Sequence, residues 1–263
     1  MARQTPVLEI ENLCLSYGSI HAVTHVDFQV REGARHALIG PNGAGKSSVF
    51  QLIAGGRRAS SGLVRYYGTD ITKVGITRRS RLGIAQTFQH SSLFPSMTAA
   101  ENVSLAAQRV LGLTAKLWST PSARRAVAEA ADAALVQTGL ADRRNTLANQ
   151  LSHGERQQLE VAIALASSPR LILFDEPTAG MSAAETERFV AIVDGLDPRI
   201  SVLIIEHDLD LVFGMATEVT VLHLGRVIVT DTPDRVRAHP EVQEAYLGPT
   251  AHAVGASTDR SDL

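Results

Sequence analysis

A glycine-rich stretch early in the chain has the residue types that bind a phosphate chain. Residues 40–47 fit the pattern G-x-x-x-x-G-K-[ST], and they stand between a short apolar run and an expected helix. Glycines let backbone N–H groups converge on phosphate oxygens, and the start of the helix adds its positive dipole end. Lys46 brings a compact positive charge to the β- and γ-phosphates, and Ser47 offers a hydroxyl to Mg²⁺. The predicted nucleoside triphosphate site consists of Gly40, Pro41, Asn42, Gly43, Ala44, Gly45, Lys46, Ser47 and Ser48.

Two adjacent carboxylates, Asp175 and Glu176, follow the fully apolar run 171–174. In open α/β sheets, ligands bind at the carboxyl ends of such strands. Asp175 would hold Mg²⁺ and neutralise charge that it shares with the phosphates. Glu176 would accept a proton from an attacking water, as a general base. Taken alone, the pair is also compatible with a strand that runs into an acidic turn, and the phosphate-binding pattern favours the catalytic interpretation.

A histidine stands in the same relation to a second apolar strand. Residues 201–205 are followed by Glu206, His207 and Asp208. His207 could contact the γ-phosphate and hold Glu176 and the attacking water in line. A single histidine is more often structural, so this role depends on the other two motifs.

The elements that position these residues alternate between strands and helices. The apolar runs 34–39, 171–174 and 202–205 have the length and composition of buried parallel strands. Two earlier segments, 7–16 and 22–30, are strand-like and predict a β-rich layer. Residues from about 96 to 154 have helical character, and Thr98 and Glu101 have the spacing of a capping box. The sequence therefore predicts an α/β core with an N-terminal β layer and an inserted helical region.

Composition excludes several other classes of protein. The 263 residues carry 25 Lys+Arg against 27 Asp+Glu and are 44% hydrophobic, which suits a folded core and not a disordered chain. The net charge of −2 provides no basic field, so we expect no nucleic acid partner. One cysteine, Cys14, excludes an internal disulfide framework and a Cys-rich zinc site. No signal peptide is recognisable at the start, and no apolar run approaches the ~20 residues that span a bilayer.

Residues 151–158, LSHGERQQ, resemble the LSGGQ signature of the ATP-binding cassette (ABC) family. The order of the motifs is also that of the family: Tyr17 before a glycine, the phosphate loop, Gln89, the signature, the acidic pair followed by Pro-Thr, and His207. The resemblance covers about residues 7–248. It implies the fold of a P-loop NTPase: an ABC cassette with a RecA-like core, an N-terminal antiparallel β layer and an inserted α-helical subdomain. The expected domains are an ABC ATPase domain at 1–248, with its helical subdomain at about 96–154, and a flexible tail at 249–263.

The resemblance also implies a role for each motif, with ATP and Mg²⁺ as cofactors. Tyr17 would stack on adenine, and Gln89 would reach Mg²⁺ and the attacking water while sensing a transmembrane partner. Two cassettes of this family sandwich two ATP molecules, so the signature of one copy faces the γ-phosphate bound by the other. The implied catalytic residues are Glu176, His207 and Gln89; the metal ligands are Ser47, Gln89 and Asp175; the signature contacts to ATP are Ser152, Gly154 and Glu155.

Three positions depart from the family pattern. The signature has His153 in place of a glycine and Glu155 in place of glutamine. Glu155 brings a negative charge close to a phosphate site, so its contact with ATP requires that its carboxylate point away. Ser182 replaces an aspartate that many relatives have after the acidic strand, which removes a charge but keeps a hydrogen-bonding group. None of these changes removes Lys46 or Glu176, and we expect an active ATPase.

Within the family, the chain resembles ATP-binding subunits of bacterial branched-chain amino acid importers through residues 87–90, 93–94, 97–98 and 244–248. Residues 151–154, 179–181 and 220–223 also resemble the urea and short-amide branch of that group. The resemblance implies transmembrane permease subunits, a second cassette that is either identical or different, and an extracytoplasmic solute-binding protein as partners. It places the chain at the cytoplasmic face of the inner membrane as a peripheral subunit.

Two other functions are alternatives to a transport ATPase. A soluble ABC-type ATPase acting on nucleic acid or ribosomes is the alternative; such proteins usually carry long coiled-coil insertions, tandem cassettes or zinc sites, and the sequence has none of these. A kinase or GTPase lacks the signature, and the guanine-reading N-K-x-D motif is absent here. The cluster Arg78, Arg79 and Arg81 is interpreted as a solvated helix face and not as a phosphate-binding patch.

Overall fold

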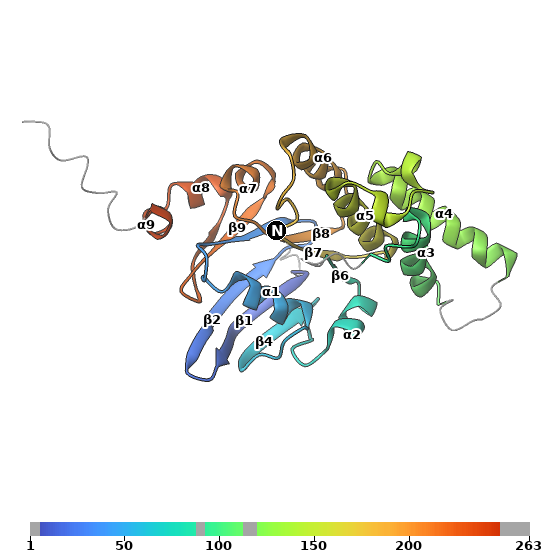
Figure 1. Cartoon of the computed structure of the whole chain (residues 1–263). Coiled ribbons are helices and arrows are strands. Elements are labelled where there is room, and N and C mark those ends of the chain that lie inside the picture. Colours follow the sequence, from blue (N-terminus) through green and yellow to red (C-terminus); the bar gives the residue numbers. More distant parts are fainter. Residues whose placement is uncertain (1–5, 88–92, 113–119, 248–263) are drawn as a thin grey trace, which may run out of the picture.

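A six-stranded sheet lies at the centre of the computed structural model, which describes residues 6–87, 93–112 and 120–247 (Figure 1). The strand order is β10-β9-β3-β8-β7-β6; the pairs from β9 to β6 are parallel, and β10 is antiparallel to β9. The strands are β3 (Arg35–Ile39), β6 (Ile84–Gln86), β7 (Leu171–Asp175), β8 (Ser201–Ile205), β9 (Glu218–His223) and β10 (Arg226–Asp231). The buried parallel strands that the apolar runs predict are confirmed.

Both faces of this sheet are covered, because successive side chains of each inner strand enter different cores. On β3, Leu38 joins one cluster of buried side chains, whereas Ala37 and Ile39 join another. The first cluster lies beneath α1 (Lys46–Ala54) and the N-terminal strands. The second lies beneath α6 (Ala183–Asp194), α7 (Leu209–Met215), α8 (Pro233–Arg237) and α9 (Pro240–Leu247). Continuous apolar runs are what a strand buried on both sides requires.

A separate four-stranded antiparallel sheet, in the order β2-β1-β4-β5, forms the predicted N-terminal layer. Its alternating side chains send Leu8, Ile10 and Val64 into the first cluster, against α1. The strands are β1 (Leu8–Tyr17), β2 (Ile20–Val30), β4 (Ser61–Tyr66) and β5 (Thr69–Asp70). The fold is therefore the one that the resemblance implied.

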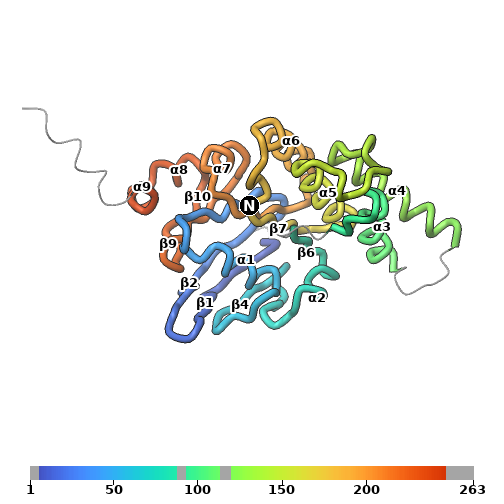
Figure 2. Tube along the Cα trace, in the orientation of Figure 1, coloured from blue at the N-terminus to red at the C-terminus, as the bar shows by residue number. Residues whose placement is uncertain are grey.

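A helical layer stands at one end of the molecule, where Figure 2 shows α3, α4 and α5 side by side. These helices share a third cluster of small and branched side chains, including Val103, Ala131 and Leu159. The capping box of Thr98 and Glu101 is confirmed at the start of α3. The elements are α3 (Ala99–Val110), α4 (Pro121–Gln137), the short 3-10 turns η1 (Ala141–Arg143) and η2 (Ala148–Gln150), and α5 (His153–Ala166). The subdomain limits of 96 and 154 stay a prediction, and the tail at 249–263 lies outside the described residues.

The arginine cluster is where the sequence interpretation is wrong. Arg79 lies in α2 (Ile76–Arg81), and it is only 1% exposed although its neighbours in the cluster are exposed. Its guanidinium donates to the carbonyls of Leu52, Ile53, Ile71, Thr72 and Val74. Leu52 and Ile53 stand at the end of α1, where carbonyls have no partner within their helix. Arg79 therefore joins the phosphate-loop helix to the segment that leads into α2.

No helix in the described ranges 6–87, 93–112 and 120–247 is long and apolar enough to cross a bilayer.

Candidate nucleotide-binding site

The three segments that carry the predicted nucleotide-binding and catalytic residues meet at one edge of the central sheet. Strand β8 lies between β3 and β7, and all three run parallel. The phosphate loop leaves the carboxyl end of β3, Asp175 and Glu176 stand at the end of β7, and His207 follows β8. Parallel strands bring their carboxyl ends together, which is where open α/β sheets bind ligands. The fold thus gathers residues that lie far apart in the chain.

The phosphate loop is shaped by glycine geometry. Gly45, with a φ of 102°, caps α1 in the left-handed region, so the helix begins at Lys46 with its first N–H groups free of side-chain caps. The Nζ of Lys46 donates to the Gly40 carbonyl at 2.7 Å and to the Pro41 carbonyl at 3.2 Å. Burial lowers the pKa of Lys46, an effect that Glu176 and Asp175 oppose. The lysine is therefore paired with its own loop and stands within the field of both carboxylates.

The acidic pair has two different environments. Asp175 is buried, and burial together with the adjacent Glu176 raises its pKa to about 6, whereas Lys46 lowers it. Glu176 is half-buried and has a φ of 49°, a left-handed conformation that is uncommon for a residue with a side chain. Its amide donates to the carbonyl of Ile205 at 2.9 Å, so β8 holds this strained peptide in place. Backbone strain of this kind is often found where a side chain must point in one direction for function.

The residues present fit a magnesium ion. The Oδ1 of Asp175 is buried and has no hydrogen-bond partner among the described residues, and such an atom requires a compensating ligand. Ser47, at the second position of α1, adds a hydroxyl oxygen, and hard oxygen ligands suit Mg²⁺. The third predicted ligand, Gln89, lies outside the described residues. A bound Mg²⁺ would neutralise charge on the phosphates that the loop holds.

His207 and its neighbour Glu206 have different surroundings. Glu206 is fully buried, and its carboxylate accepts from the amide and hydroxyl of Thr178 and from the amide of His207. The imidazole of His207 is 61% exposed, and its Nδ1 lies 3.7 Å from that carboxylate. The ring is accordingly free to turn toward a ligand at the sheet edge. Glu206, which the sequence did not single out, holds the residues that follow the acidic pair.

Tyr17 stands at the end of β1 and is 42% exposed. The guanidinium of Arg57 lies 5.2 Å from the centre of its ring, which is the distance of a cation–π contact. The exposed ring of Tyr17 is therefore already in contact with a planar cation.

The signature residues cap a helix. Ser152 is the N-cap of α5, and its Oγ accepts from the amide of Glu155 while the Glu155 carboxylate accepts from the amide of Ser152. Arg143 donates to the same carboxylate at 2.8 Å. The pKa of Glu155 is lowered, first by the Ser152 amide and further by Arg143. This carboxylate is thus directed to its own helix and to Arg143. A contact of Glu155 with ATP would require such an orientation, with the negative charge pointing away from the phosphates.

The amide of Gly154, in the first turn of α5, is not a free N–H group. It donates to Oε1 of Glu185 at 3.2 Å, and the other oxygen of that carboxylate accepts from the amide and hydroxyl of Ser182, the N-cap of α6. His153 adds a contact between its Nε2 and the carbonyl of Ala179 at 3.0 Å. The spacing of Ser182 and Glu185 is that of a capping box and could have been found in the sequence. The contact of Glu185 with a glycine 31 positions away could not have been found in the sequence.

Comparison with known proteins agrees with this arrangement. Residues 23–179 match the family model described as ABC transporter, which is more than half of the chain. The chain belongs to the ABC transporter family. Residues 226–248 of this ABC protein also match a model described as branched-chain amino acid ATP-binding cassette transporter.

Curated relatives are similar over nearly their whole length. The high-affinity branched-chain amino acid transport ATP-binding protein BraF of Pseudomonas aeruginosa is 36% identical over 250 residues, which is 92% of this chain and 98% of BraF. LivG of Escherichia coli K12, with the same description, is 34% identical over equal shares of both chains. A crystal structure of the ADP conformation of an ATP-binding cassette of an ABC transporter has a TM-score of 0.81 and 28% identity, covering 92% of this chain and 99% of that one. The chain is a nucleotide-binding cassette and an ATPase.

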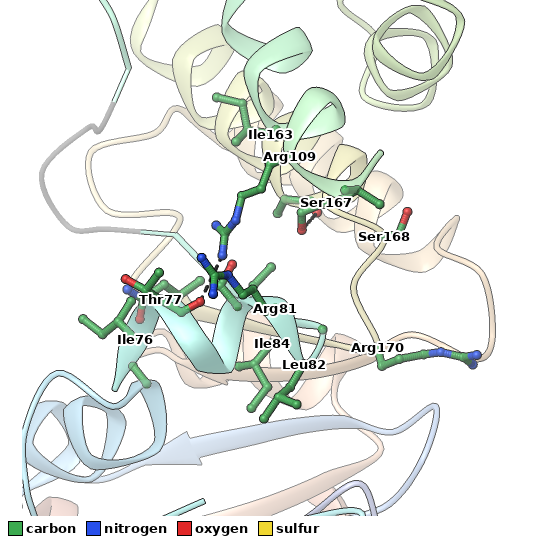
Figure 3. A pocket seen from close by; sticks show the side chains of 18 residues that line it. Ile76, Thr77, Arg81, Leu82, Ile84, Arg109, Ile163, Ser167, Ser168 and Arg170 are labelled. Atoms are coloured by element: carbon green, nitrogen blue, oxygen red, sulfur yellow. Dashed lines mark hydrogen bonds between the residues drawn. The ribbon is translucent and has the colours of Figure 1, made fainter. Parts of the chain in front are cut away.

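The cassette also has a cavity away from the sheet edge that carries the acidic pair. A cavity of about 680 Å³ opens between the sheet end at β6 and the helical layer (Figure 3). Arg109 of α3 reaches across it and donates to the carbonyl of Thr77 in α2 at 3.1 Å. No phosphate-loop or acidic-pair residue lines the cavity. The cavity thus lies between α2 and β6 on one side and α3 and α5 on the other, away from the predicted nucleotide site.

The raised pKa of Asp175 gives the cassette a testable dependence of stability on pH. A carboxyl group whose pKa is higher in the folded state stabilises the fold below its unfolded pKa of ~3.9, and this contribution is lost as pH rises through about 6. We therefore expect Asp175→Asn to equal the wild type in stability near pH 4 and to exceed it at pH 7.5, by about 2 kcal/mol. Urea unfolding in EDTA, without nucleotide, measures this difference. Equal stability of the two proteins at both pH values would contradict the prediction.

Proposed function

We propose that the chain is the ATP-hydrolysing subunit of an importer for branched-chain amino acids. The observation that carries this proposal is the match of residues 226–248 to the branched-chain amino acid cassette model, together with 36% identity to BraF over almost the full length of both proteins. That C-terminal segment lies beyond the part matched by the general ABC model. The comparisons do not support the soluble ABC-type ATPase that the sequence left as an alternative.

The geometry of the sheet edge supports the chemistry of this proposal. Lys46 and the loop amides would bind the β- and γ-phosphates, and Ser47 and Asp175 would hold Mg²⁺. Glu176, fixed by its strained backbone, would take the proton of the attacking water, and His207 would hold that water and the γ-phosphate. Tyr17 would stack on adenine. Gln89 would complete the site from the segment outside the described residues.

The proposed assembly follows from the arrangement of the half-sites. The phosphate loop of one copy and Ser152 with Gly154 of another would enclose each ATP, so a complete site requires a second cassette, identical or different. ABC ATP-binding subunits dimerise and work with transmembrane permeases, and we assign this one to the cytoplasmic face of the membrane as a peripheral subunit. A solute-binding protein outside the membrane would select the cargo.

Uptake measurements test the proposed cargo. Cells that lack this chain but retain the permease subunits should lose uptake of labelled leucine, and the wild-type gene should restore it. A gene carrying Glu176→Gln should not restore uptake, whereas one carrying Glu187→Gln, an equal change at an exposed position of α6, should do so. Loss of urea or acetamide uptake with normal leucine uptake would instead assign the chain to the amide branch.

A further inference from the structure

The turn between β9 and β10 lies against the phosphate loop. Strand β9 runs parallel to β3, so the residues that follow β9 emerge at the same sheet edge as the loop that follows β3. The hairpin is closed by Leu224 and Gly225, whose φ angles of 47° and 77° are both positive. A two-residue turn of this kind requires left-handed backbone at both positions, and leucine rarely adopts it. A strained turn is therefore held beside the predicted phosphate-binding residues.

Gly225 is hydrogen bonded to the loop on one side and to β2 on the other. Its amide donates to the carbonyl of Ala44 at 3.0 Å, and its own carbonyl accepts from the amide of Thr24 at 2.8 Å. A Cβ at Gly225 would lie 2.9 Å from the carbonyl oxygen of Ala22, and a Cβ at Gly45 would lie 2.6 Å from the same oxygen. The turn, the loop and β2 are thus packed backbone to backbone, and a displacement of one is passed to the other two.

The hydrogen bond from Gly225 fixes the direction of one peptide of the loop. The carbonyl of Ala44 and the N–H of Gly45 belong to the same peptide, and in a trans peptide these two groups point in opposite directions. Because the carbonyl is aimed at the turn, the N–H is aimed away from it. Among the described residues this N–H has no hydrogen-bond acceptor, and it immediately precedes Lys46 at the start of α1. The loop therefore presents a backbone donor that has a fixed direction and no partner.

We propose that Gly225 is a positioning residue for the phosphate loop: its amide holds the peptide between Ala44 and Gly45 so that the Gly45 N–H donates to a phosphate oxygen of the bound nucleotide. Glycine permits many backbone angles, so this peptide could rotate easily if the turn did not hold it. A donor that is already oriented needs no reorganisation when the phosphate arrives, and its hydrogen bond to a charged oxygen is a strong one. The β9–β10 turn thereby contributes to nucleotide affinity without touching the nucleotide. This inference rests on the proposed assignment of residues 40–48 to phosphate binding.

A side chain at position 225 tests the inference. In Gly225→Ala the added Cβ presses on the carbonyl of Ala22 and moves the turn away from the loop. The Kd for Mg·ADP, measured by calorimetry on the full-length chain, should therefore rise about ten- to hundredfold. NMR of protein with isotope-labelled glycine reports on the peptide itself. Saturating Mg·ADP should shift the Gly45 amide resonance strongly in the wild type and less in the variant.

The matched control is the turn between β4 and β5. Tyr67 and Gly68 form it with φ angles of 47° and 73°, close to those of the β9–β10 turn, but a Cβ at Gly68 would meet nothing within 4 Å. Gly68→Ala therefore introduces an equally strained alanine and should lower stability to a similar extent, with the Kd of the wild type. Gly225→Asn adds the same Cβ but adopts left-handed backbone more readily, so it replaces the alanine variant if that variant does not fold.

The outcomes separate this inference from the proposed function. If the wild-type protein fails to bind Mg·ADP, the proposed nucleotide site is wrong. If the wild type binds and the Gly225 variants bind equally well, or if their Gly45 resonance responds as in the wild type, only the role of Gly225 is wrong. An equal rise in Kd for Gly68→Ala would show a general effect of a strained turn and would also overturn the inference.

Discussion

Replacing Glu176 with glutamine is expected to lower the rate of ATP hydrolysis at least about 100-fold while ATP still binds. Glutamine has nearly the same shape as glutamate, so it keeps the packing at the end of β7, but its amide cannot accept a proton from water. The amide of Glu176 donates to the carbonyl of Ile205, so glutamine at this position should keep the same left-handed backbone. The neighbouring acid, Asp175, is assigned to the metal. Single-turnover hydrolysis and ATP titration measure the two effects separately.

A second consequence concerns assembly. With hydrolysis stopped, ATP remains between the two cassettes, so we expect the Glu176→Gln protein to accumulate as a dimer in Mg·ATP during gel filtration. Glu187→Gln, at an exposed position on α6, changes the charge equally and should hydrolyse ATP normally. Normal turnover by the Glu176 variant would remove the general-base assignment.

Replacing Arg79 with methionine is expected to reduce the free energy of unfolding by about 3 kcal/mol or more. The guanidinium donates to five backbone carbonyls, and its removal takes a donor from each of them, although the carbonyls of Leu52 and Ile71 keep a backbone N–H partner. Burial lowers the pKa of Arg79 to about 10, so the side chain stays charged at neutral pH and its charge is balanced by the carbonyl dipoles. Urea unfolding of the nucleotide-free protein measures the loss.

Two further variants define the cause of that loss. Arg78→Met removes an equal charge from the exposed neighbouring position and should change stability by less than ~0.5 kcal/mol. Arg79→Lys keeps the charge but cannot reach all of the carbonyls, and it should be intermediate. If Arg79→Lys is as stable as the wild type, charge alone and not the network of hydrogen bonds explains the effect.

Much of the fold could be predicted because local patterns and tertiary demands agree. The runs 171–174 and 202–205 are apolar at every position, as strands buried on both faces require, and they form β7 and β8. The capping box at Thr98 and Glu101 depends on residues three apart and was readable for the same reason. The placement of Lys46 with Asp175 and Glu176 followed from the rule that parallel strands end at one edge. Their chemical roles stay predictions.

What the sequence did not reveal depends on contacts between distant segments. The segment ITRRSR reads as a solvated helix, because nothing near Arg79 in sequence shows that the end of α1 supplies carbonyls to it. The contact of Glu185 with Gly154 likewise joins residues from separate elements. In each case a polar side chain is paired with a backbone atom. Because all residues share the same backbone, the residue types in the sequence do not reveal such a partner.

The carboxylate of Glu185 touches the first turns of two helices, α5 and α6, at once. Each copy of the cassette therefore carries a tethered counter-ion at its own signature. If a phosphate held by a second copy binds the Gly154 amide, as proposed, that phosphate replaces the Glu185 carboxylate there. One anion is then exchanged for another, and the phosphate does not bind to a helix N-terminus that was without an anion. Few dissolved ions are displaced in such an exchange. Closure of the pair should consequently depend less on ionic strength than the charges of ATP alone would imply.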